Sequence, residues 1–524
     1  MKIFNTAGTC FPDRHYMVDI SDRIEVIRKM ISRGDYFCIN RGRQYGKTTT
    51  LDAIRQNLSG QYCIFSISFE DVEDSSFENE RTLYATFVRI LSKSFRWTSI
   101  QGLDNEVRNI ILDFSKEHTA ECSTEDLQFF ISDICHLNTK PIVLVIDEVD
   151  QAGNHPSFLK FLGLLRAMFL NRYDAPTFQS VILAGVYDIK NLKLKLRSEE
   201  QHQYNSPWNI AVPFDVDMSL SQKGIMQMLE EYKADTQTDV DTALISTLIR
   251  DYTAGYPFLV SRLCQLMEGQ QDWSKSGFLK AVKSLLVERN TLFDDMNKKL
   301  EQFPEMRLLL ENILYKGERV PFTLSSRYIE IAAMFGFIVN REGAVAISNR
   351  IFETLLYEKF VTDDMLSTTK NRIYKEAQNS KPEFVKADGT LDMPLILSRF
   401  VQTFKEVFGE QPDYFLEDEG RRYFLLFVKP IINGVGNYYV EAQTRDGLRT
   451  DLIIDYLGHR YIVEMKIWRG ESYNQRGEQQ LTEYLDRYDE TTGYLLSFCF
   501  NKNKKPGLKQ PIVVNGKTVV EAVV

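Results

Sequence analysis

The stretch YFCINRGRQYGKTTTL at residues 36–51 constrains the fold of this chain more than any other part of its sequence. An apolar strand is followed by a tight turn that contains glycine, and a helix then opens with Lys-Thr-Thr. A helix N-terminus presents unpaired N–H groups and the positive end of the helix dipole, so a loop folded over it is suited to bind phosphate. Gly46, Lys47 and Thr48 match the end of the Walker A pattern G-x-x-x-x-G-K-[ST]. The sequence therefore predicts a phosphate-binding loop.

The match is imperfect at its start, because Arg41 occupies the position of the first glycine and Gly42 follows one residue later. An ordinary strand-to-helix turn is the alternative interpretation of this fragment. In a nucleotide site Lys47 would bridge the β- and γ-phosphates, and the Thr48 hydroxyl would ligate Mg²⁺. The residues that we predict to bind nucleotide from this loop are Gly42, Gln44, Tyr45, Gly46, Lys47, Thr48 and Thr49.

A second motif, PIVLVIDEVD at residues 141–150, makes a nucleotide site the favoured interpretation. Its continuous apolar run is typical of a strand buried on both faces. The run ends in two adjacent carboxylates, as a Walker B strand does, although many apolar strands end in an acid at the solvent edge. Asp147 would hold Mg²⁺ through water, and Glu148 would polarise the attacking water.

Length and composition limit the remaining possibilities. A chain of 524 residues is too long for one core, so we expect two or three domains. No apolar run approaches the ~20 residues that span a bilayer, and no secretory signal opens the sequence. Seven scattered cysteines and six histidines favour neither a zinc module nor a disulfide framework. We therefore expect a cytoplasmic protein without a membrane partner, and its net charge of -9 confines any nucleic-acid surface to a local patch.

Strands and helices alternate through residues 1–218. This alternation predicts a parallel sheet covered by helices on both faces, with ligands at the carboxyl ends of its strands. If the strand at 62–69 lies outside the Walker B strand, another strand must separate the two motifs, and 180–186 is the natural occupant. The further elements predicted here are strands at 62–69, 180–186 and 209–216 and helices at 17–31, 78–95, 124–135 and 158–170.

This order of elements resembles the AAA+ and STAND ATPases, in which an additional strand separates the two motifs. The resemblance implies a polar sensor at the end of that strand, where Tyr187 or Asp188 stands. It also implies an arginine finger, for which Arg197 is the candidate. A solvated helix face explains Arg197 equally well.

Residues 219–300 are predicted to form a helical lid. Their Gly-Tyr-Pro at 255–257 resembles the G-x-P turn of STAND and origin-recognition ATPases. That resemblance implies that Pro257 lies beside the nucleotide and that Arg262 reaches its phosphates, although Gly-x-Pro is common between helices. Residues 301–361 carry helical segments and two apolar runs around Arg-Glu-Gly, which predict a winged-helix unit. Its near-neutral charge favours a packing or regulatory role over DNA reading.

A polar segment at 362–394 is predicted to be a linker, and a separate α/β domain is expected at 395–524. Asp451 begins the second of three short strands, and Glu464 and Lys466 share one face of the third. Two carboxylates and a lysine at one sheet edge are suited to hold Mg²⁺ beside a water that attacks phosphate. The alternative is an exposed hairpin face with alternating charges.

This constellation resembles the PD-(D/E)xK nuclease superfamily. Asp451 corresponds to the first acid, and Glu464 and Lys466 correspond to E-x-K, so the resemblance implies that both acids bind metal. The resemblance also implies an additional catalytic acid from the preceding helix, for which Glu419 or Glu417 is the candidate. Thr450 stands where the family name has proline, as in divergent members.

Over its whole length the chain resembles bacterial proteins that join an AAA-like ATPase domain to a C-terminal PD-(D/E)xK domain. We therefore expect an ATP-regulated nuclease that acts on DNA and uses ATP and Mg²⁺, with Mn²⁺ as a substitute metal. RNA is the alternative nucleic acid, and a homo-oligomer is left open. A role in defence against mobile elements follows from analogy alone. The rival interpretation is a STAND-like signalling or scaffold NTPase whose nuclease-like domain binds nucleic acid without cleaving it.

Overall fold

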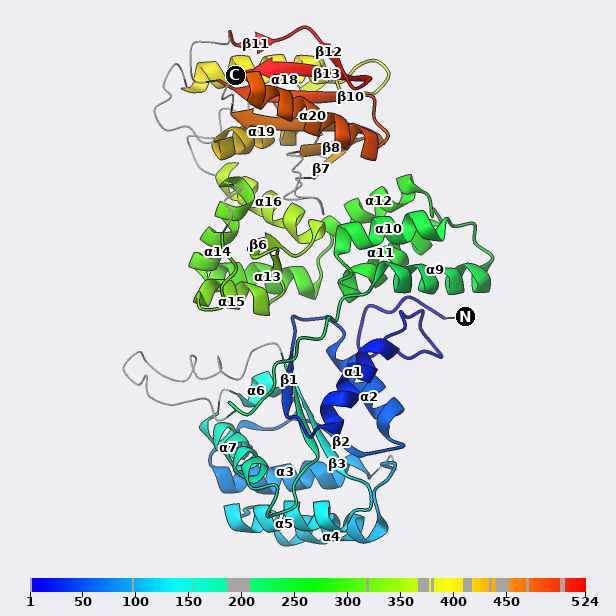
Figure 1. The fold of residues 1–524 in the computed structure, drawn as a ribbon, viewed down its shortest axis with the longest axis vertical. Coiled ribbons are helices and arrows are strands. Elements are labelled where there is room, and N and C mark those ends of the chain that lie inside the picture. Colours follow the sequence, from blue (N-terminus) through cyan, green and yellow to red (C-terminus); the bar gives the residue numbers. More distant parts are fainter. Residues whose placement is uncertain are drawn as a thin grey trace. The chain divides into compact units, whose positions relative to one another are not determined.

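The computed structural model divides into two compact units (Figure 1). The first comprises Met1–Ser246, Gly255–Gln265 and Met334–Gly336, and the remaining residues form the second. No helix in the described part of the chain is long and apolar enough to cross a membrane. The structure describes all residues except 1, 97–98, 154, 186–207, 317–319, 366–376, 378–380, 409–416, 433–435, 440–451, 468–470 and 500–504.

The first unit is built on a four-stranded parallel sheet. Its strands are β1 (Phe37–Asn40), β2 (Cys63–Ser68), β3 (Ile142–Asp147) and β4 (Ser180–Gly185), and their order is β1-β4-β3-β2. The prediction that the fourth strand separates the two motif strands is confirmed. The carboxyl ends of β1 and β3 therefore open on the same edge of the sheet, with β4 between them.

Helices cover both faces of this sheet, because successive apolar residues of each strand point to opposite sides. Val143 and Val145 of β3 pack with α1 and α2, whereas Leu144 and Ile146 pack with helices of the other face. Helix α4 was not predicted from the sequence. The helices of this region are α1 (Ser21–Ser32), α2 (Lys47–Leu58), α3 (Glu80–Ser94), α4 (Asn105–Glu117), α5 (Thr124–Leu137), α6 (Val149–Ala152) and α7 (Pro156–Leu170), with a 3₁₀ turn at Asp74–Phe77.

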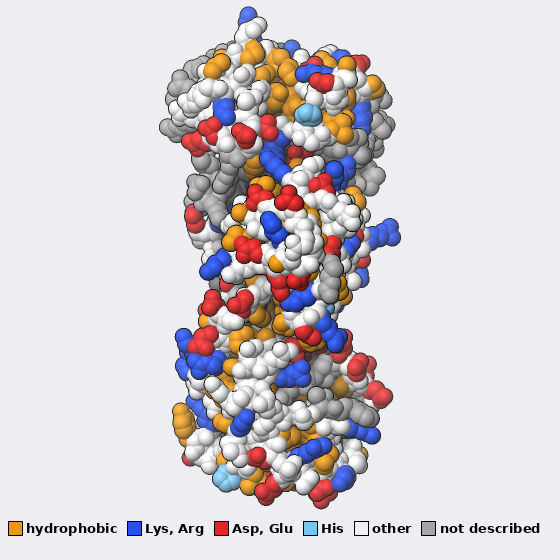
Figure 2. All heavy atoms as spheres, turned by 90° about the vertical axis from the view of Figure 1, so that its right-hand side faces the viewer, with side chains coloured by type: hydrophobic (Ala, Val, Ile, Leu, Met, Phe, Trp, Pro, Cys, Tyr) orange, Lys and Arg blue, Asp and Glu red, His pale blue; other side chains and the backbone are white. Residues whose placement is uncertain are grey.

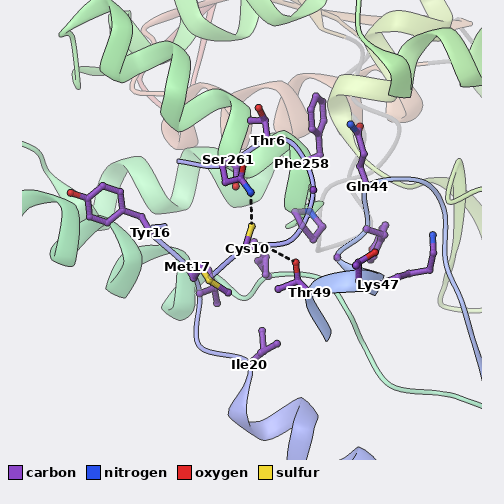
Figure 3. A pocket seen from close by; sticks show the side chains of 18 of the residues that line it. Thr6, Cys10, Tyr16, Met17, Ile20, Gln44, Lys47, Thr49, Phe258 and Ser261 are labelled. Carbon is purple, nitrogen blue, oxygen red and sulfur yellow. Dashed lines mark hydrogen bonds between the residues drawn. The ribbon is translucent and has the colours of Figure 1, made fainter. Parts of the chain in front are cut away.

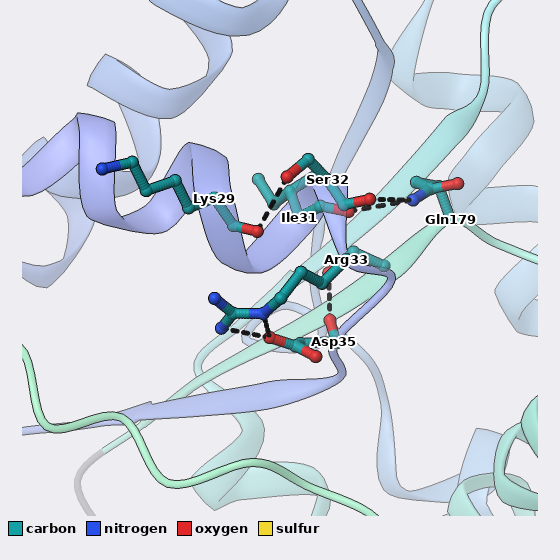
Figure 4. Close-up of polar contacts among 7 residues, drawn as sticks. Lys29, Ile31, Ser32, Arg33, Asp35 and Gln179 are labelled. Carbon is teal, nitrogen blue, oxygen red and sulfur yellow. Dashed lines mark hydrogen bonds and ion pairs between the residues drawn. The ribbon is translucent and has the colours of Figure 1, made fainter.

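The end of α1 is tied to the start of the sheet (Figure 4). The Gln179 side chain, just before β4, donates to the carbonyl of Ile31 at 2.9 Å and to that of Ser32 at 3.4 Å. These contacts satisfy carbonyls that a helix C-terminus leaves open. Ser180 Oγ also donates to the carbonyl of Asp35 at 2.6 Å. Helix α1 and the strands β1 and β4 are thus fixed together at the edge opposite the phosphate loop.

The predicted fifth strand at 209–216 is wrong in extent. The structure has one isolated parallel bridge there, between Phe37 and Val212. Pro213 lacks the N–H that a ladder would need, so pairing stops. Hydrogen bonds from Arg41 hold the segment in place of a strand ladder. Its guanidinium donates to the carbonyls of Val216 at 2.8 Å and Phe214 at 3.4 Å. The segment lies beside β1, as expected, but side-chain contacts hold it there.

Between residues 219 and 290, where the sequence predicts helices, the described structure has four of them. Two of them, α10 and α11, begin in one unit and end in the other. The turn between them contains Gly255 with a φ of 74°, a left-handed conformation that glycine adopts readily. The helices are α9 (Gln222–Thr236), α10 (Thr242–Thr253), α11 (Pro257–Gln270) and α12 (Lys275–Leu286).

The next segment contains helices followed by the predicted antiparallel hairpin around Arg-Glu-Gly. Glu342 and Gly343 both have positive φ, which suits a tight hairpin turn. A bridge between Pro321 and Ala344 adds to this hairpin. The elements are α13 (Thr291–Gln302), α14 (Pro304–Glu311), a π turn (Asn312–Lys316), α15 (Arg327–Met334), β5 (Ile338–Arg341), β6 (Ala344–Ile347) and α16 (Arg350–Met365).

The C-terminal part of the second unit has its own mixed sheet. Strands β7, β8 and β9 pair antiparallel, whereas β9, β10 and β13 pair parallel. The sheet order is β11-β13-β10-β9-β8-β7, with β12 also on β13. The elements are a 3₁₀ turn (Lys381–Phe384), α18 (Met393–Phe408), α19 (Glu417–Ile432), β7 (Gly436–Tyr439), β8 (Leu452–Tyr456), β9 (His459–Ile467), α20 (Glu471–Arg487), β10 (Thr492–Phe498), β11 (Gly507–Leu508), β12 (Ile512–Val514) and β13 (Lys517–Val523).

The role of Arg41 in place of a fifth strand is testable. Arg41→Ala would leave the carbonyls of Phe214 and Val216 without this donor, so we expect a loss of about 1–3 kcal/mol in unfolding free energy. Denaturant unfolding followed by circular dichroism measures it. Arg81→Ala is the control, because its pair with Glu121 is exposed and 3.8 Å long, and should cost less than about 1 kcal/mol. Equal losses in the two variants would contradict the bracing role.

Candidate functional site

The phosphate loop connects β1 to α2 with two left-handed residues, Gln44 with φ 55° and Gly46 with φ 79°. Lys47 is the first residue of α2 and is only 8% exposed. Its Nζ donates to the carbonyls of Arg41 at 3.0 Å and Gly42 at 3.1 Å. The ammonium therefore lies under the loop, where a bound phosphate would meet it together with the open N–H groups of α2.

The displaced glycine of this loop has a steric cause. A Cβ on Gly42 would lie 2.7 Å from the carbonyl oxygen of Phe335, so only glycine fits there. Arg41, one residue earlier, directs its guanidinium to residues 214–216, and its ring contact with Phe214 is 5.6 Å from centroid to Cζ. The arginine thus occupies the place of the first glycine while its charged end is engaged outside the phosphate loop.

The carboxylates at the end of β3 lie next to this loop. Thr48 Oγ1 donates to Asp147 Oδ2 at 3.5 Å, and the backbone N–H of Glu148 donates to Asp147 Oδ1 at 2.9 Å. Glu148 has a φ of 52°, a conformation that is costly for a residue with a side chain and that is concentrated at functional sites. The strained turn brings both acids of the predicted Walker B motif to the side of Lys47.

The charges of this cluster influence one another. Burial raises the pKa of Asp147, and burial followed by the charge of Asp147 raises the pKa of Glu148. Burial lowers the pKa of the Lys47 ammonium, while Asp150, Glu148 and Asp147 act in the opposite direction. A carboxylate with a raised pKa accepts a proton more readily, which is the property that a general base needs.

A cavity of about 260 Å³ opens above the loop (Figure 3). Residues 44–49 and Glu148 form its polar end, and Pro257, Phe258 and Ser261 of α11 line another side. The remaining wall comes largely from the N-terminal segment, residues 5–20, which the sequence analysis did not assign to the site. Residues 5–16 were assigned to no element, and residues 17–20 were predicted as the start of a helix, which in the structure begins at Ser21.

The N-terminal segment is hydrogen-bonded to the phosphate-loop helix. The backbone N–H of Cys10 donates to Thr49 Oγ1 at 3.2 Å, and Asn5 Nδ2 contacts Cys10 Sγ at 3.5 Å (Figure 3). The apolar side chains of Tyr16 and Ile20 also line the cavity. The cavity therefore combines polar groups with apolar walls, as ligand pockets in proteins commonly do.

The predicted G-x-P turn also reaches the loop. The Tyr256 hydroxyl donates to the carbonyl of Arg43, and the rings of Tyr45 and Tyr256 meet edge to face with centroids 4.6 Å apart. Pro257 lies against Gly46, since a Cβ there would be 3.8 Å from Pro257 Cγ. Of the predicted lid residues, Pro257 thus joins the site.

Other predicted residues of this site are not brought to the cavity in the described structure. Arg262 Nη1 donates to the side chain of Gln265, one turn later on α11. Arg262 is not among the residues that line the cavity, whereas its neighbour Ser261 is. Tyr187, Asp188 and Arg197 lie outside the described residues.

A second group of predicted site residues lies on β9. Glu464 and Lys466 share a face, and Lys466 Nζ is 3.3 Å from Glu464 Oε1. Glu464 is 2% exposed, and Lys466 Nζ also donates to the side chain of Gln480 from α20. A Cβ on Gly477 would lie 3.0 Å from Lys466 Cδ, so α20 packs closely on the lysine stem.

The acidic side chains expected beside Glu464 and Lys466 are not among those that the structure describes. Asp451 is not among the described residues, and the side chain of Glu419 is likewise not described, although its helix α19 is. Within the described ranges no group of three or more His, Cys, Asp or Glu side chains could hold a metal ion. Glu464 is thus the one predicted metal ligand of this domain whose surroundings are described.

The sheet order, the loop and the acids at the end of β3 define an α/β domain of the P-loop ATPase type. The model of the AAA-like domain family matches residues 13–358, so the chain belongs to the AAA-like domain family. No curated protein matches the chain in sequence.

Solved structures with similar folds have low sequence identity to this chain. A Walker-type ATPase of Pyrococcus abyssi is 14% identical with a TM-score of 0.44, over 67% of this chain and 99% of its own. The ORC2 protein of Aeropyrum pernix, in ADPNP and ADP complexes, is 11% identical with a TM-score of 0.37, over 66% of this chain and 94% of its own. The ORC1 protein of Aeropyrum pernix, in complex with DNA, is 12% identical with a TM-score of 0.29, over 67% and 95% of the two chains.

The position of Cys10 offers a chemical test of the cavity. ATP bound there should slow alkylation of Cys10 by a maleimide, and peptide mass spectrometry measures the rate. Cys499, which is also partly buried but lies in the second unit, is the control and should react at an unchanged rate. Lys47→Ala should remove the protection, because its ammonium faces the phosphates. Equal protection of both cysteines, or none, would contradict a nucleotide site in this cavity.

Proposed function

We propose that the first unit binds and hydrolyses ATP and that the nucleotide state regulates a metal-dependent nuclease at the C-terminus that cleaves DNA. The observation that carries the first half is that Lys47, Thr48 and Glu148 line one cavity, with Asp147 hydrogen-bonded to Thr48 beside it. Lys47 would hold the β- and γ-phosphates, and Glu148 would orient the attacking water and accept its proton. Thr48 and Asp147 fit Mg²⁺, since both present oxygen atoms at the loop, and the ion would neutralise phosphate charge.

The C-terminal half of the proposal rests on residues 395–524. Glu464 and Lys466 lie on β9, with Gln480 of α20 beside them. The elements around them follow the order helix, three strands, helix and strand, from α19 to β10, and this order supports a PD-(D/E)xK core. Asp451 and Glu419 would complete the acidic set. Glu464 and Asp451 would hold Mg²⁺ or Mn²⁺, which supplies the charge that activates water, and Lys466 would place its ammonium beside the scissile phosphate.

The remaining parts of the chain fit into this proposal as a lid at 219–300, a winged-helix unit at 301–361 and a linker at 362–394. The helices and hairpin between α13 and α16 have the order that a winged helix needs. Acidic and basic side chains are interspersed on the face drawn in Figure 2, which supports a local rather than a general nucleic-acid surface. DNA is the proposed substrate, with RNA as the alternative, and the proposed role is defence against mobile elements in the cytoplasm.

Two substitutions separate binding from hydrolysis in the first unit. Lys47→Ala should abolish ATP binding, because it removes the charge that faces the phosphates, and isothermal calorimetry measures this. Glu148→Gln should keep binding and lower turnover about 10²- to 10⁴-fold, because only proton acceptance is lost. Asn57→Ala, an exposed residue in the last turn of α2, is the control. Unchanged ATP affinity in Lys47→Ala would remove the P-loop assignment, and normal turnover in Glu148→Gln would place the base elsewhere.

The nuclease assignment predicts a separate loss. Lys466→Ala should lower plasmid cleavage in Mg²⁺ or Mn²⁺ at least about 10²-fold, since a fixed charge beside the phosphate disappears, while ATP hydrolysis changes little. Lys405→Ala, an exposed lysine on α18 of the same domain, is the control. Asp451→Ala should lose cleavage as well. If purified wild-type protein binds DNA but never cuts it, the signalling or scaffold alternative is the better reading; cleavage that survives both substitutions would refute the site.

A further inference from the structure

Helix α16 connects three parts of the second unit through its first residue, Arg350. Arg350 Nη1 is 3.1 Å from Asp251 Oδ2 of α10, and Arg350 Nη2 donates to the Tyr488 hydroxyl at 3.0 Å. Tyr488 directly follows α20, the helix that carries Gln480. The guanidinium also lies 5.2 Å from the centroid of the Tyr252 ring. One side chain thus joins a lid helix, the helix after the hairpin and the C-terminal domain.

The contacts continue into the C-terminal sheet. Arg460 lies over the Tyr488 ring, with Cζ 4.8 Å from its centroid, and its Nε is 3.6 Å from Asp455 Oδ1. Asp455 and Arg460 belong to β8 and β9, and their side chains are 10% and 7% exposed. Strand β9 is the strand that carries Glu464 and Lys466. The chain of contacts from Asp251 therefore ends on the strand of the proposed nuclease site.

The far end of α16 is clamped to the C-terminal domain as well. Lys429 Nζ of α19 donates to the carbonyl of Glu358 at 3.3 Å and to Thr362 Oγ1 at 3.2 Å. Burial lowers the pKa of Lys429 and raises the pKa of Glu358, while each charge favours the ionised form of the other. With polar contacts at both ends of α16, the C-terminal domain and this helix are expected to move together.

The start of this route is joined to the phosphate loop by the chain itself. Asp251 and Tyr252 lie in the last turn of α10, and Tyr256, four residues beyond Tyr252, donates its hydroxyl to the carbonyl of Arg43. A change in the loop on nucleotide binding would pull on Tyr256 and so on the end of α10. The contacts at Arg350 are within reach of that displacement through a few residues of backbone.

We propose that Arg350 is the relay through which nucleotide bound in the first unit alters the nuclease-like domain, by way of Asp251, Tyr488 and Arg460. This inference rests on the proposed function. A ligand shifts such an equilibrium only by its differential affinity for two states, so the expected effect is about 5- to 150-fold in rate. Tyr488→Phe removes one hydroxyl and keeps the ring on Arg460, so it tests the relay with little change to packing.

The experiment uses the full chain in the Glu148→Gln background, where ATP stays bound. The ratio of plasmid cleavage rates with and without ATP is measured for this protein and after adding Arg350→Ala, Tyr488→Phe or the exposed control Arg327→Ala. Hydrogen exchange of residues 484–490 and of α10, with and without ATP, gives a readout that needs no cleavage. We expect the ratio to fall to within about twofold of one in Arg350→Ala and to fall partly in Tyr488→Phe. The control should keep the ratio, and α10 should keep its response to ATP in all variants.

The outcomes separate the relay from the function on which it rests. If ATP changes cleavage and exchange equally in all variants, the relay is overturned while the regulated nuclease stands. If ATP changes neither in the Glu148→Gln protein, the regulatory part of the proposed function fails and the relay fails with it. If no variant cleaves DNA, exchange at 484–490 decides: a response to ATP that disappears in Tyr488→Phe supports the relay, and one that persists refutes it.

Discussion

The buried ammonium of Lys47 is the constraint around which the first unit is arranged. A charge taken out of water costs several kcal/mol unless other groups satisfy it. Here the carbonyls of Arg41 and Gly42 accept its hydrogen bonds, and the acids that end β3 supply opposite charge. The two strands that carry these groups must therefore end at the same edge of the sheet, and β4 between them fixes their spacing. The phosphate loop and the acids at the end of β3 thus both lie where they can pair with the Lys47 ammonium.

Much of this arrangement was predictable, because the signals are local. Strand β3 is a continuous apolar run that ends in two acids, and β4 is a similar run, so their burial and their place in a parallel sheet followed from the pattern. The loop could be recognised from Gly46, Lys47 and Thr48 between a strand and a helix, once the acidic end of β3 favoured a nucleotide site over an ordinary turn. Likewise Glu464 and Lys466 had to share a face of β9 once the strand was assigned.

The rest depends on contacts between residues far apart in sequence, which no local pattern reveals. Residues 5–16 of the N-terminal wall of the cavity carry no motif, and their place is set by bonds such as that from Cys10 to Thr49. Arg41 could be interpreted only as a missing glycine until its contacts with residues 214–216 were visible. The same holds for Arg350, whose position at the start of a helix gave no indication of partners on α10 and after α20.

The path of the chain adds a further constraint. Apart from residues 1–246, the first unit contains only Gly255–Gln265 and Met334–Gly336, and both of these short segments touch the phosphate loop. Tyr256 and Pro257 of the first contact Arg43 and Gly46, and Phe335 of the second closes over Gly42. Both segments continue directly into helices and strands of the second unit. A nucleotide that changed the backbone at 42–46 would therefore act on the points where the two units share their chain, and the shifted glycine of this P-loop is explained by one of them.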